Sequence, residues 1–396
     1  ATSSSSGSIR VSASREARAK MPAPEKTPRL EYLSQWQLIR RRFVKHRVAL
    51  TAFFILLVLY TVAAFAGFFA PYTTQWHNVD YSYAPPQLPH LSLDHGIYTY
   101  GLVPYRDPVT LRKGYVEDTN AIVRLGFFVK GEPYRILGLI PTSRHFFGVI
   151  DPTPPGTPVE DEPANVFYLL GADRYGHDIF SRIILGARIS LSIGIAGIAM
   201  TFVLGVIIGG ISGYASGAID NFIQRLIEIL NSFPRLPMWL ALSASFPDDW
   251  SPLKTYFAIT LVLSLLGWTR LARVVRGKLL SLREEDYAVA ARLIGASHWR
   301  IIFSHLLPGF TSHIIVTLTM RVPQMILGET SLSFLGLGLR PPVVSWGVML
   351  QDCMNMQAVA HYPWLLLPVV FIILTVLCFN FLGDGLRDAA DPYSTH

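Results

Sequence analysis

The chain has 396 residues, of which 51% are hydrophobic and only 15% are charged. A soluble chain carries roughly a quarter charged residues, so this composition excludes an ordinary soluble enzyme and favours the lipid bilayer as solvent. The 34 basic and 27 acidic residues give a net charge of +7. No recognisable nucleic-acid-binding module accompanies this charge, and we therefore expect no nucleic acid partner.

The N-terminal region, residues 1–47, is expected to lie in the cytoplasm. Residues 1–29 are rich in Ser, Ala, Pro and charge, which predicts disorder. From Leu30 to Arg47 large apolar residues recur at helical spacing, which predicts an interfacial helix on the inner membrane face. A simple continuation of the first membrane span is the alternative. Basic residues gather directly before an apolar run, as the positive-inside rule expects of a cytoplasmic flank.

Six apolar runs are predicted to span the membrane. They are Val48–Ala70, Ile189–Tyr214, Phe222–Ser245, Tyr256–Val274, Phe310–Phe334 and Trp364–Leu382. Each reaches about 19 residues, which suffices for a hydrocarbon core of ~30 Å at a rise of about 1.5 Å per residue. The first span is too long for a signal-peptide core and is expected to stay uncleaved. Six spans place both termini in the cytoplasm.

The charge between the spans favours the same orientation. Residues 270–300 carry seven basic residues against three acidic ones, and six spans place them inside. Residues 71–167 form an extracytoplasmic insertion with an acidic cluster near its end, for which a small β-containing domain and turn-rich coil are both open. Residues 168–393 hold the other five spans and form the core of the predicted membrane protein. The predicted fold class is therefore an all-α membrane protein.

The segment 281–308, between the fourth and fifth spans, predicts a cytoplasmic helix–turn–helix. Ser281 and Glu284 have the spacing of a capping box, which starts a helix. Gly295 is a natural helix stop, because glycine adopts the left-handed conformation readily. Ser297 can then cap a second helix, which ends before the proline that closes the segment.

The first of these two helices has an unusual surface for a connector. Ala288, Ala290 and Ala291 make it thin, while Tyr287 and Ile294 supply apolar bulk. A thin helix with an apolar anchor suits docking into a groove of another protein. Packing of the helix on its own subunit is the alternative.

This segment carries a family resemblance. The matching residues are Asp286, Tyr287, Ala290, Ala291, Gly295, Leu307 and Pro308. They resemble the cytoplasmic EAA loop of permease subunits in ATP-binding-cassette importers, where the loop docks into a cleft of the ATPase subunit and transmits nucleotide-driven closure. The resemblance implies that these seven residues form an ATPase-coupling loop. Val289 stands where the family usually has Glu, so the salt bridge that this Glu would form with the ATPase subunit has no counterpart at this position. His305 stands where an aliphatic residue is common.

Further segments resemble the second permease of oligopeptide and dipeptide importers, in the MetI-like transmembrane domain family. They are Leu170–Leu191, Leu332–Gly338, Ser345–Gly347 and Gly383–Pro392. Ala172 and His177 stand where family members usually have Thr and Arg. The resemblance is weak over residues 30–70 and strong over residues 168–393.

The resemblance implies a permease subunit in the bacterial inner membrane that forms half of a translocation pathway for peptides. The implied partners are a second permease subunit, two ATP-binding subunits, a periplasmic solute-binding protein and the lipid bilayer. ATP and Mg would bind to the ATP-binding subunits, so this chain is expected to hold no cofactor or metal and to be no enzyme. A nickel complex, a sugar or an opine is the alternative cargo, and a channel or an intramembrane enzyme is the alternative class.

The residues themselves offer no catalytic or nucleotide site. The phosphate-binding pattern Gly-x-x-x-x-Gly-Lys-Ser/Thr does not occur, and the eleven histidines lack metal-ligand spacing. Cys353 and Cys378 are not expected to form a disulfide, because only Cys378 lies within an apolar run.

Ionisable residues within the predicted spans are of two kinds. Arg321 and Glu329 fall in the fifth span, where they are expected either to line the transport pathway or to stabilise the fold by pairing. Arg225 and Glu228 lie three residues apart on one helix face, which predicts a structural ion pair near the inner interface.

Overall fold

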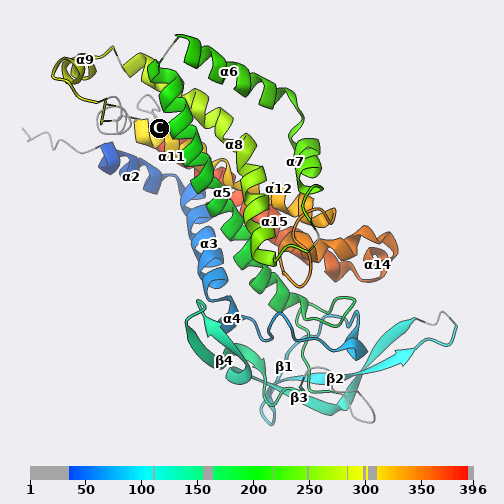
Figure 1. Cartoon of the computed structure of the whole chain (residues 1–396). Helices are drawn as coiled ribbons and strands as arrows, with labels where there is room; N and C mark the ends of the chain where they lie inside the picture. The colour runs from blue at the N-terminus through cyan, green and yellow to red at the C-terminus, as the bar shows by residue number, and fades with distance from the viewer. Residues whose placement is uncertain are drawn as a thin grey trace, which may run out of the picture.

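A computed structural model shows how these segments are arranged. It describes residues 35–109, 112–154, 164–215, 217–247, 249–282, 284–297, 300–301 and 310–390. The disorder predicted for residues 1–29 therefore lies outside the described residues. Figure 1 shows an elongated helical body with a β-sheet at one end and the short helix α9 (Asp286–Leu293) at the other.

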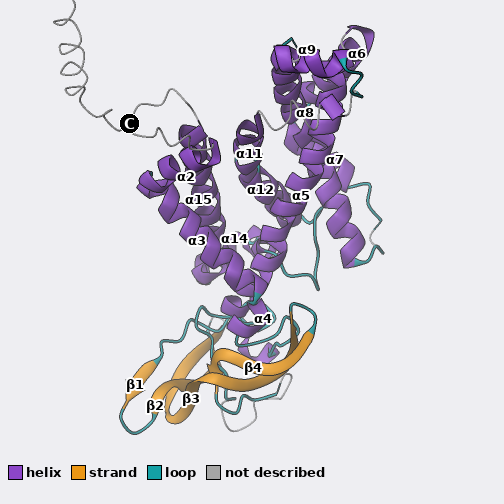
Figure 2. Cartoon of the chain, turned by 90° about the vertical axis from the view of Figure 1, so that its left-hand side faces the viewer, coloured by secondary structure: helices purple, strands orange, loops and turns teal. Residues whose placement is uncertain are grey.

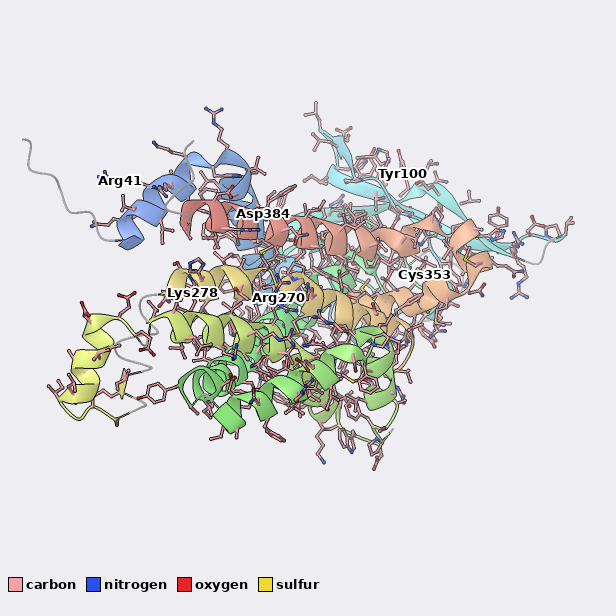
Figure 3. All side chains as sticks on the ribbon, turned by 90° about the horizontal axis from the view of Figure 1, so that it is seen from above. Arg41, Tyr100, Arg270, Lys278, Cys353 and Asp384 are labelled. Atoms are coloured by element: carbon pink, nitrogen blue, oxygen red, sulfur yellow. The ribbon has the colours of Figure 1, made fainter. Side chains whose placement is uncertain are left out.

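The described chain begins with a helix that is distinct from the first span, as predicted. The first helices are α2 Gln35–Lys45, α3 Arg47–Ala64 and α4 Ala66–Phe69. His46 separates α2 from α3, and its ring Nδ1 caps α3 by accepting a hydrogen bond from the Ala49 N–H at 3.1 Å. Figure 3 shows Arg41 on α2 near the end of α15 (Leu367–Ala390) that carries Asp384.

Among the described residues, four helices are long and apolar enough to cross a membrane, judged by length and composition. They are α3, α5 Ile179–Ala215, α8 Pro252–Leu282, and α15 together with the preceding turn η5 Pro363–Leu366. The helices α5 and α8 approach closely, since a Cβ atom on Gly209 would lie only 2.6 Å from the carbonyl oxygen of Ala272. Small residues at such contacts are typical of helix pairs in membranes.

The predicted third and fifth spans are wrong as single helices, because each is broken. The pieces are α6 Gly217–Ser232 and α7 Arg235–Ser243, and α11 Thr311–Thr319 and α12 Val322–Phe334. Pro234 and Pro323 sit at the starts of α7 and α12, and proline cannot donate the hydrogen bond that would continue the preceding helix. Figures 1 and 2 show α6 and α7 running in succession from the α9 end toward the sheet.

The insertion folds as a sheet, so the all-α prediction is wrong for this segment and the β-containing alternative holds. The strands are β1 His90–Ser92, β2 Gly96–Arg106, β3 Lys113–Ile136 and β4 Ile140–Val149. They are antiparallel and neighbour each other in chain order, with Ile97 opposite Leu125 and Leu125 opposite Val149. Alternation of β-branched and aromatic residues with polar ones suits such a half-buried sheet.

The insertion is fixed to the helical core rather than suspended on flexible linkers. The amide of Gln87 exchanges hydrogen bonds with the backbone, its Oε1 accepting from the Tyr168 N–H at 2.8 Å. The rings of Tyr83 and Tyr362 stack with centroids 4.1 Å apart. The short helices next to this contact are η1 Val79–Tyr81, α13 Trp346–Met349, η4 Leu350–Met354 and α14 Met356–His361.

The largest apolar core joins α3, α5, α12 and α15. Trp346 is fully buried at its centre, and its indole N–H donates to the Ile183 carbonyl at 3.0 Å. Both cysteines are free thiols, as predicted.

Candidate functional site

The predicted coupling segment contains a helix that ends where expected but begins later. The helix α9 starts at Asp286, and Gly295 terminates it with a φ of +82°. The predicted capping box is wrong, because Ser281 belongs to the last turn of α8 and its hydroxyl donates to the Lys278 carbonyl at 2.9 Å. The apolar face of α8 carries that helix to Leu282, past the predicted start.

The two faces of α9 have different environments. Ala288 and Ala291 are buried against Leu279 and Ile301 of the same chain. The Ala291 side chain therefore packs inside its own subunit, and its predicted place in a docking surface with Ala290 and Gly295 stays a prediction. The alternative of packing on the same chain thus holds for this face.

The opposite side of α9 is open. Leu293 and Ile294 are 82% and 86% exposed, and Asp286, Ala290 and Gly295 are exposed as well. Two adjacent, almost fully exposed aliphatic side chains at a helix end are typical of a protein contact surface. Of the other predicted coupling residues, Leu307, Pro308 and the side chain of Tyr287 lie outside the described part of the chain. We call Leu293 and Ile294 with the adjoining turn the α9 tip.

A polar cluster that the sequence did not reveal supports the α9 end of the helical body. Asp220 of α6 accepts two hydrogen bonds from the guanidinium of Arg276 on α8, at 2.6 and 2.5 Å. Ser212 of α5 donates to the same carboxylate at 2.5 Å, and Gln224 donates to Ser212. The cluster thus ties α5, α6 and α8 together; a lone acid in an apolar region was the only sequence signal.

Glu329, one of the two predicted pathway residues, is buried within the chain. Its carboxylate accepts hydrogen bonds from the hydroxyls of Ser345 at 2.7 Å, Ser333 at 2.8 Å and Ser190 at 3.3 Å. These donors come from α5, α12 and the segment before α13. Because a buried carboxylate is costly unless hydrogen bonds compensate it, this arrangement supports the stabilising alternative over a pathway role.

Arg321, the other predicted pathway residue, lies in a different environment. Its Nη1 donates to Gln324 at 2.7 Å, and Arg235 of α7 donates to the same oxygen at 3.3 Å. The Arg321 Nη2 has no hydrogen-bond partner among the described residues. Arg321 itself is buried, whereas Arg235 and Gln324 are exposed at the surface shared by α7 and α12. The structure therefore separates the two predicted pathway residues.

A cavity of about 670 Å³ lies at the sheet end of the molecule. Its walls come from residues 74–79 of the insertion, residues 173–182, and residues 341–352 of the core. Asp173 accepts from Arg182 at 2.5 Å and from the His177 ring at 2.9 Å. Burial raises the pKa of Asp173, but these bonds outweigh it and hold the pKa below its usual range.

A second ion pair in the same cavity joins Arg174 to Asp352 at 3.0 Å. Burial nevertheless raises the pKa of Asp352 above its usual range, and Arg174 offsets this only in part. Within the described ranges no group of three or more His, Cys, Asp or Glu side chains is placed to hold a metal ion. The cavity thus combines a largely apolar lining with ion pairs formed among its own charged residues.

Comparison with known protein families gives two matches. Residues 202–394 match the family described as binding-protein-dependent transport system inner membrane component. Residues 34–86 match the N-terminal TM domain of oligopeptide transport permease C. The sheet formed by residues 90–149 lies between these two matches and outside both.

Individual relatives agree with this assignment. The oligopeptide transport system permease protein OppC of Bacillus subtilis is 40% identical over 233 residues, 59% of this chain and 74% of that protein. The dipeptide transport system permease protein DppC of the same organism is 40% identical over 230 residues, 58% of this chain and 70% of that protein. OppC of Escherichia coli K12 is 40% identical over 226 residues, which are 57% of this chain and 72% of that protein.

These matches confirm the resemblance found in the sequence and place the functional residues in a membrane transport subunit rather than in a catalytic one. The chain belongs to the family of binding-protein-dependent transport system inner membrane components, as a multi-pass permease of the oligopeptide and dipeptide type.

Proposed function

We propose that this chain is one of two permease subunits in an ATP-driven importer of peptides. Its relatives include permeases named for oligopeptide, dipeptide and glutathione transport, all of which are peptide cargoes. A separate second permease would complete the translocation pathway, and an external solute-binding protein would deliver the peptide. Two ATP-binding subunits would hold ATP and Mg and supply the energy, so this chain needs no cofactor of its own.

The observation that carries this proposal is the α9 tip. Its exposed Leu293 and Ile294 lie at the end of the body opposite the sheet (Figure 1). The buried face of α9 packs on α8. A movement of Leu293 and Ile294 would therefore be transmitted to α8 through this contact. A groove on an ATP-binding subunit would bury both side chains, which is the helix-in-groove mode of recognition.

The same arrangement supports an orientation in the membrane. The helix α2, the α9 tip and the end of α15 share one end of the molecule (Figures 1 and 2). Basic residues of α2, such as Arg41 and Arg42, favour the cytoplasm for that end. The sheet and the cavity of residues 74–79, 173–182 and 341–352 would then face outside, where a peptide is handed over. The chain would cross the membrane six times, with α6–α7 and α11–α12 as the two interrupted passes.

Charge placed on the α9 tip tests the proposal. In the reconstituted complex, the Leu293→Asp, Ile294→Asp double variant should lose the ATP-binding subunits on purification and lose uptake of a labelled tripeptide. The matched control is Ser281→Asp, which adds a carboxylate at an exposed position on the neighbouring turn of α8. Retained association and uptake in the double variant would refute the coupling role.

A further inference from the structure

The turn between β3 and β4 exposes several large apolar side chains, which are unusual in a turn that faces water. Residues 136–140 read Ile-Leu-Gly-Leu-Ile, and Leu137, Leu139 and Ile140 are 54%, 80% and 63% exposed. Leu137 has a φ of +49°, a conformation that Asn, Asp or Gly adopts at lower cost. Hairpin turns in water favour those polar residues. The apolar side chains therefore need a reason other than the turn geometry.

This hairpin lies beside the outer end of the first membrane span. The helix α4 continues α3 at the sheet end, and the Tyr134 ring of β3 packs directly against Gly67 of α4. The His145 ring of β4 bonds the Ala70 carbonyl at 2.6 Å. Figures 1 and 2 show the hairpin rising beside α4, on the side of the sheet that faces the helical body. The hairpin is thus held against α4, the helix that directly follows the first span.

An aromatic layer connects the span to the hairpin. Phe68 of α4 contacts Phe128 and Phe146 of the hairpin, with ring centroids 6.1 and 5.8 Å apart. Phe69 contacts Phe146 at 5.6 Å. Phe128 is exposed, so the layer also has an open side. Aromatic belts of this kind are typical of the membrane–water interface.

Two arginines accompany the hairpin tip, while the nearby Glu132 of β3 accepts a hydrogen bond from the Thr73 hydroxyl. Residues 133–150 contain Arg135 and Arg144 and no Asp or Glu, and both arginines are exposed. They lie on either side of the apolar turn, where lipid phosphates would lie if the turn entered the bilayer. Apolar residues at the turn with cations behind them match the layered polarity of a leaflet.

We propose that the β3–β4 tip, residues 136–140, inserts into the outer leaflet of the bilayer and anchors the sheet beside the first span. Leu137, Leu139 and Ile140 contact acyl chains, and Arg135 and Arg144 contact phosphates. The anchor fixes the sheet with respect to the membrane surface, so that the cavity behind it keeps a constant position for the external delivery of cargo. This role is independent of which cargo is carried and of the α9 tip.

Site-specific fluorescence in lipid nanodiscs tests the insertion. The full chain, with Cys353 and Cys378 replaced by alanine, carries one new cysteine labelled with nitrobenzoxadiazole, either Leu139→Cys or Leu93→Cys. Leu93 is a fully exposed leucine in the β1–β2 turn and serves as the matched control. Lipids with a spin label near the head of the acyl chain should quench the probe at position 139 at least about threefold more than at position 93, as for an interfacial anchor.

Two results would overturn the proposal. One is equal quenching of both positions by aqueous iodide together with no quenching of position 139 by the labelled lipid. The other is a probe at position 139 whose fluorescence is not quenched by the labelled lipid and changes only when purified binding protein is added. That result would make the tip a protein-docking site instead.

Discussion

Two turns at opposite ends of the molecule expose aliphatic side chains beside a glycine of positive φ. At the α9 tip Leu293 and Ile294 precede such a glycine, and at the β3–β4 tip Leu137 and Leu139 flank another. Both turns stand on a rigid base, since α9 packs on α8 and the hairpin packs on α4. The apolar side chains alone therefore do not distinguish the two turns.

The surroundings of the two turns differ, and they indicate different partners. Glu284, Glu285, Asp286 and Arg292 precede the α9 tip, whereas Arg135 and Arg144 flank the β3–β4 tip with Glu132 as the acidic residue near them. The α9 tip also lies within the part of the chain that matches the transporter family, and the hairpin lies outside it. A surface of mixed charge within the shared family region suits another protein of the complex, while an aromatic surface with arginines suits lipid.

The largest expected effect comes from the backbone at the α9 tip. Gly295→Val forces a β-branched residue to a φ of +82°, although a Cβ atom there would meet no neighbour within 4 Å. Such strain costs about 1–3 kcal/mol and should move the tip, so peptide uptake should fall at least about tenfold while the chain still inserts. Gly295→Asn, which tolerates this conformation, should keep uptake near wild type. Equal loss in both variants would point to a direct contact of Gly295 instead.

The next effect concerns the support behind that tip. Asp220→Ala leaves Arg276 without its carboxylate, and removal of one partner of a buried pair costs about 3–5 kcal/mol. Because Arg276 is 31% exposed, we expect the free energy of unfolding to fall by only about 1–3 kcal/mol, with a lower melting temperature of the purified chain. The Asp220→Ala, Arg276→Ala double variant should be no less stable than the single one. Strictly additive losses would show that the two residues act separately.

The sheet end should respond to pH through Asp178, which directly precedes α5. Burial raises the pKa of Asp178 to about 7, and its Oδ1 has no hydrogen-bond partner among the described residues. Between about pH 4 and 7 the folded state then holds a proton that the unfolded state has lost, so stability falls as pH rises, by up to about 4 kcal/mol. Thermal melts of wild type at pH 5 and pH 8 should show this fall. Asp178→Asn should reduce the loss of stability between these two pH values. An unchanged pH dependence in this variant would contradict the role of Asp178.

The smallest effect is expected at the surface of α6. Arg225 and Glu228 form the predicted ion pair at 2.9 Å, but both side chains are largely exposed. Exposed pairs contribute about 0–1 kcal/mol, so Arg225→Ala should leave the melting temperature within about 2 °C of wild type. A larger shift would indicate that another subunit covers this face of α6.

The positions of the long helices could be predicted from the sequence because hydropathy and length alone decide them. The helix α5 contains the predicted span 189–214, and Gly295 ends α9 as its residue type requires. Pro234 is visible in the sequence as an interruption of the third apolar run, whereas the break before Pro323 was missed, since an apolar run hides an interruption that only the packed chain reveals. The start of α9 was missed because the apolar face of α8 outweighed a local capping signal.

Long-range polar contacts could not be predicted, because partners far apart in sequence leave no local pattern. Asp220 and Arg276 are 56 residues apart, and Glu329 meets Ser190 across 139 residues. The same reason explains Ala291, whose burial depends on α8 rather than on its own helix. The sheet was only one of two alternatives because register shifts near Tyr100 and between Lys130 and Tyr134 interrupt the regular alternation along its strands.

Photocrosslinking in the assembled importer tests the central claim that the α9 tip binds an ATP-binding subunit. A benzoylphenylalanine in place of Ile294 is compared with one in place of Leu139, in complexes held in nanodiscs. The account predicts a covalent product between position 294 and an ATP-binding subunit, and none between position 139 and that subunit. A functional complex in which position 294 links only to its own chain or to lipid would contradict it.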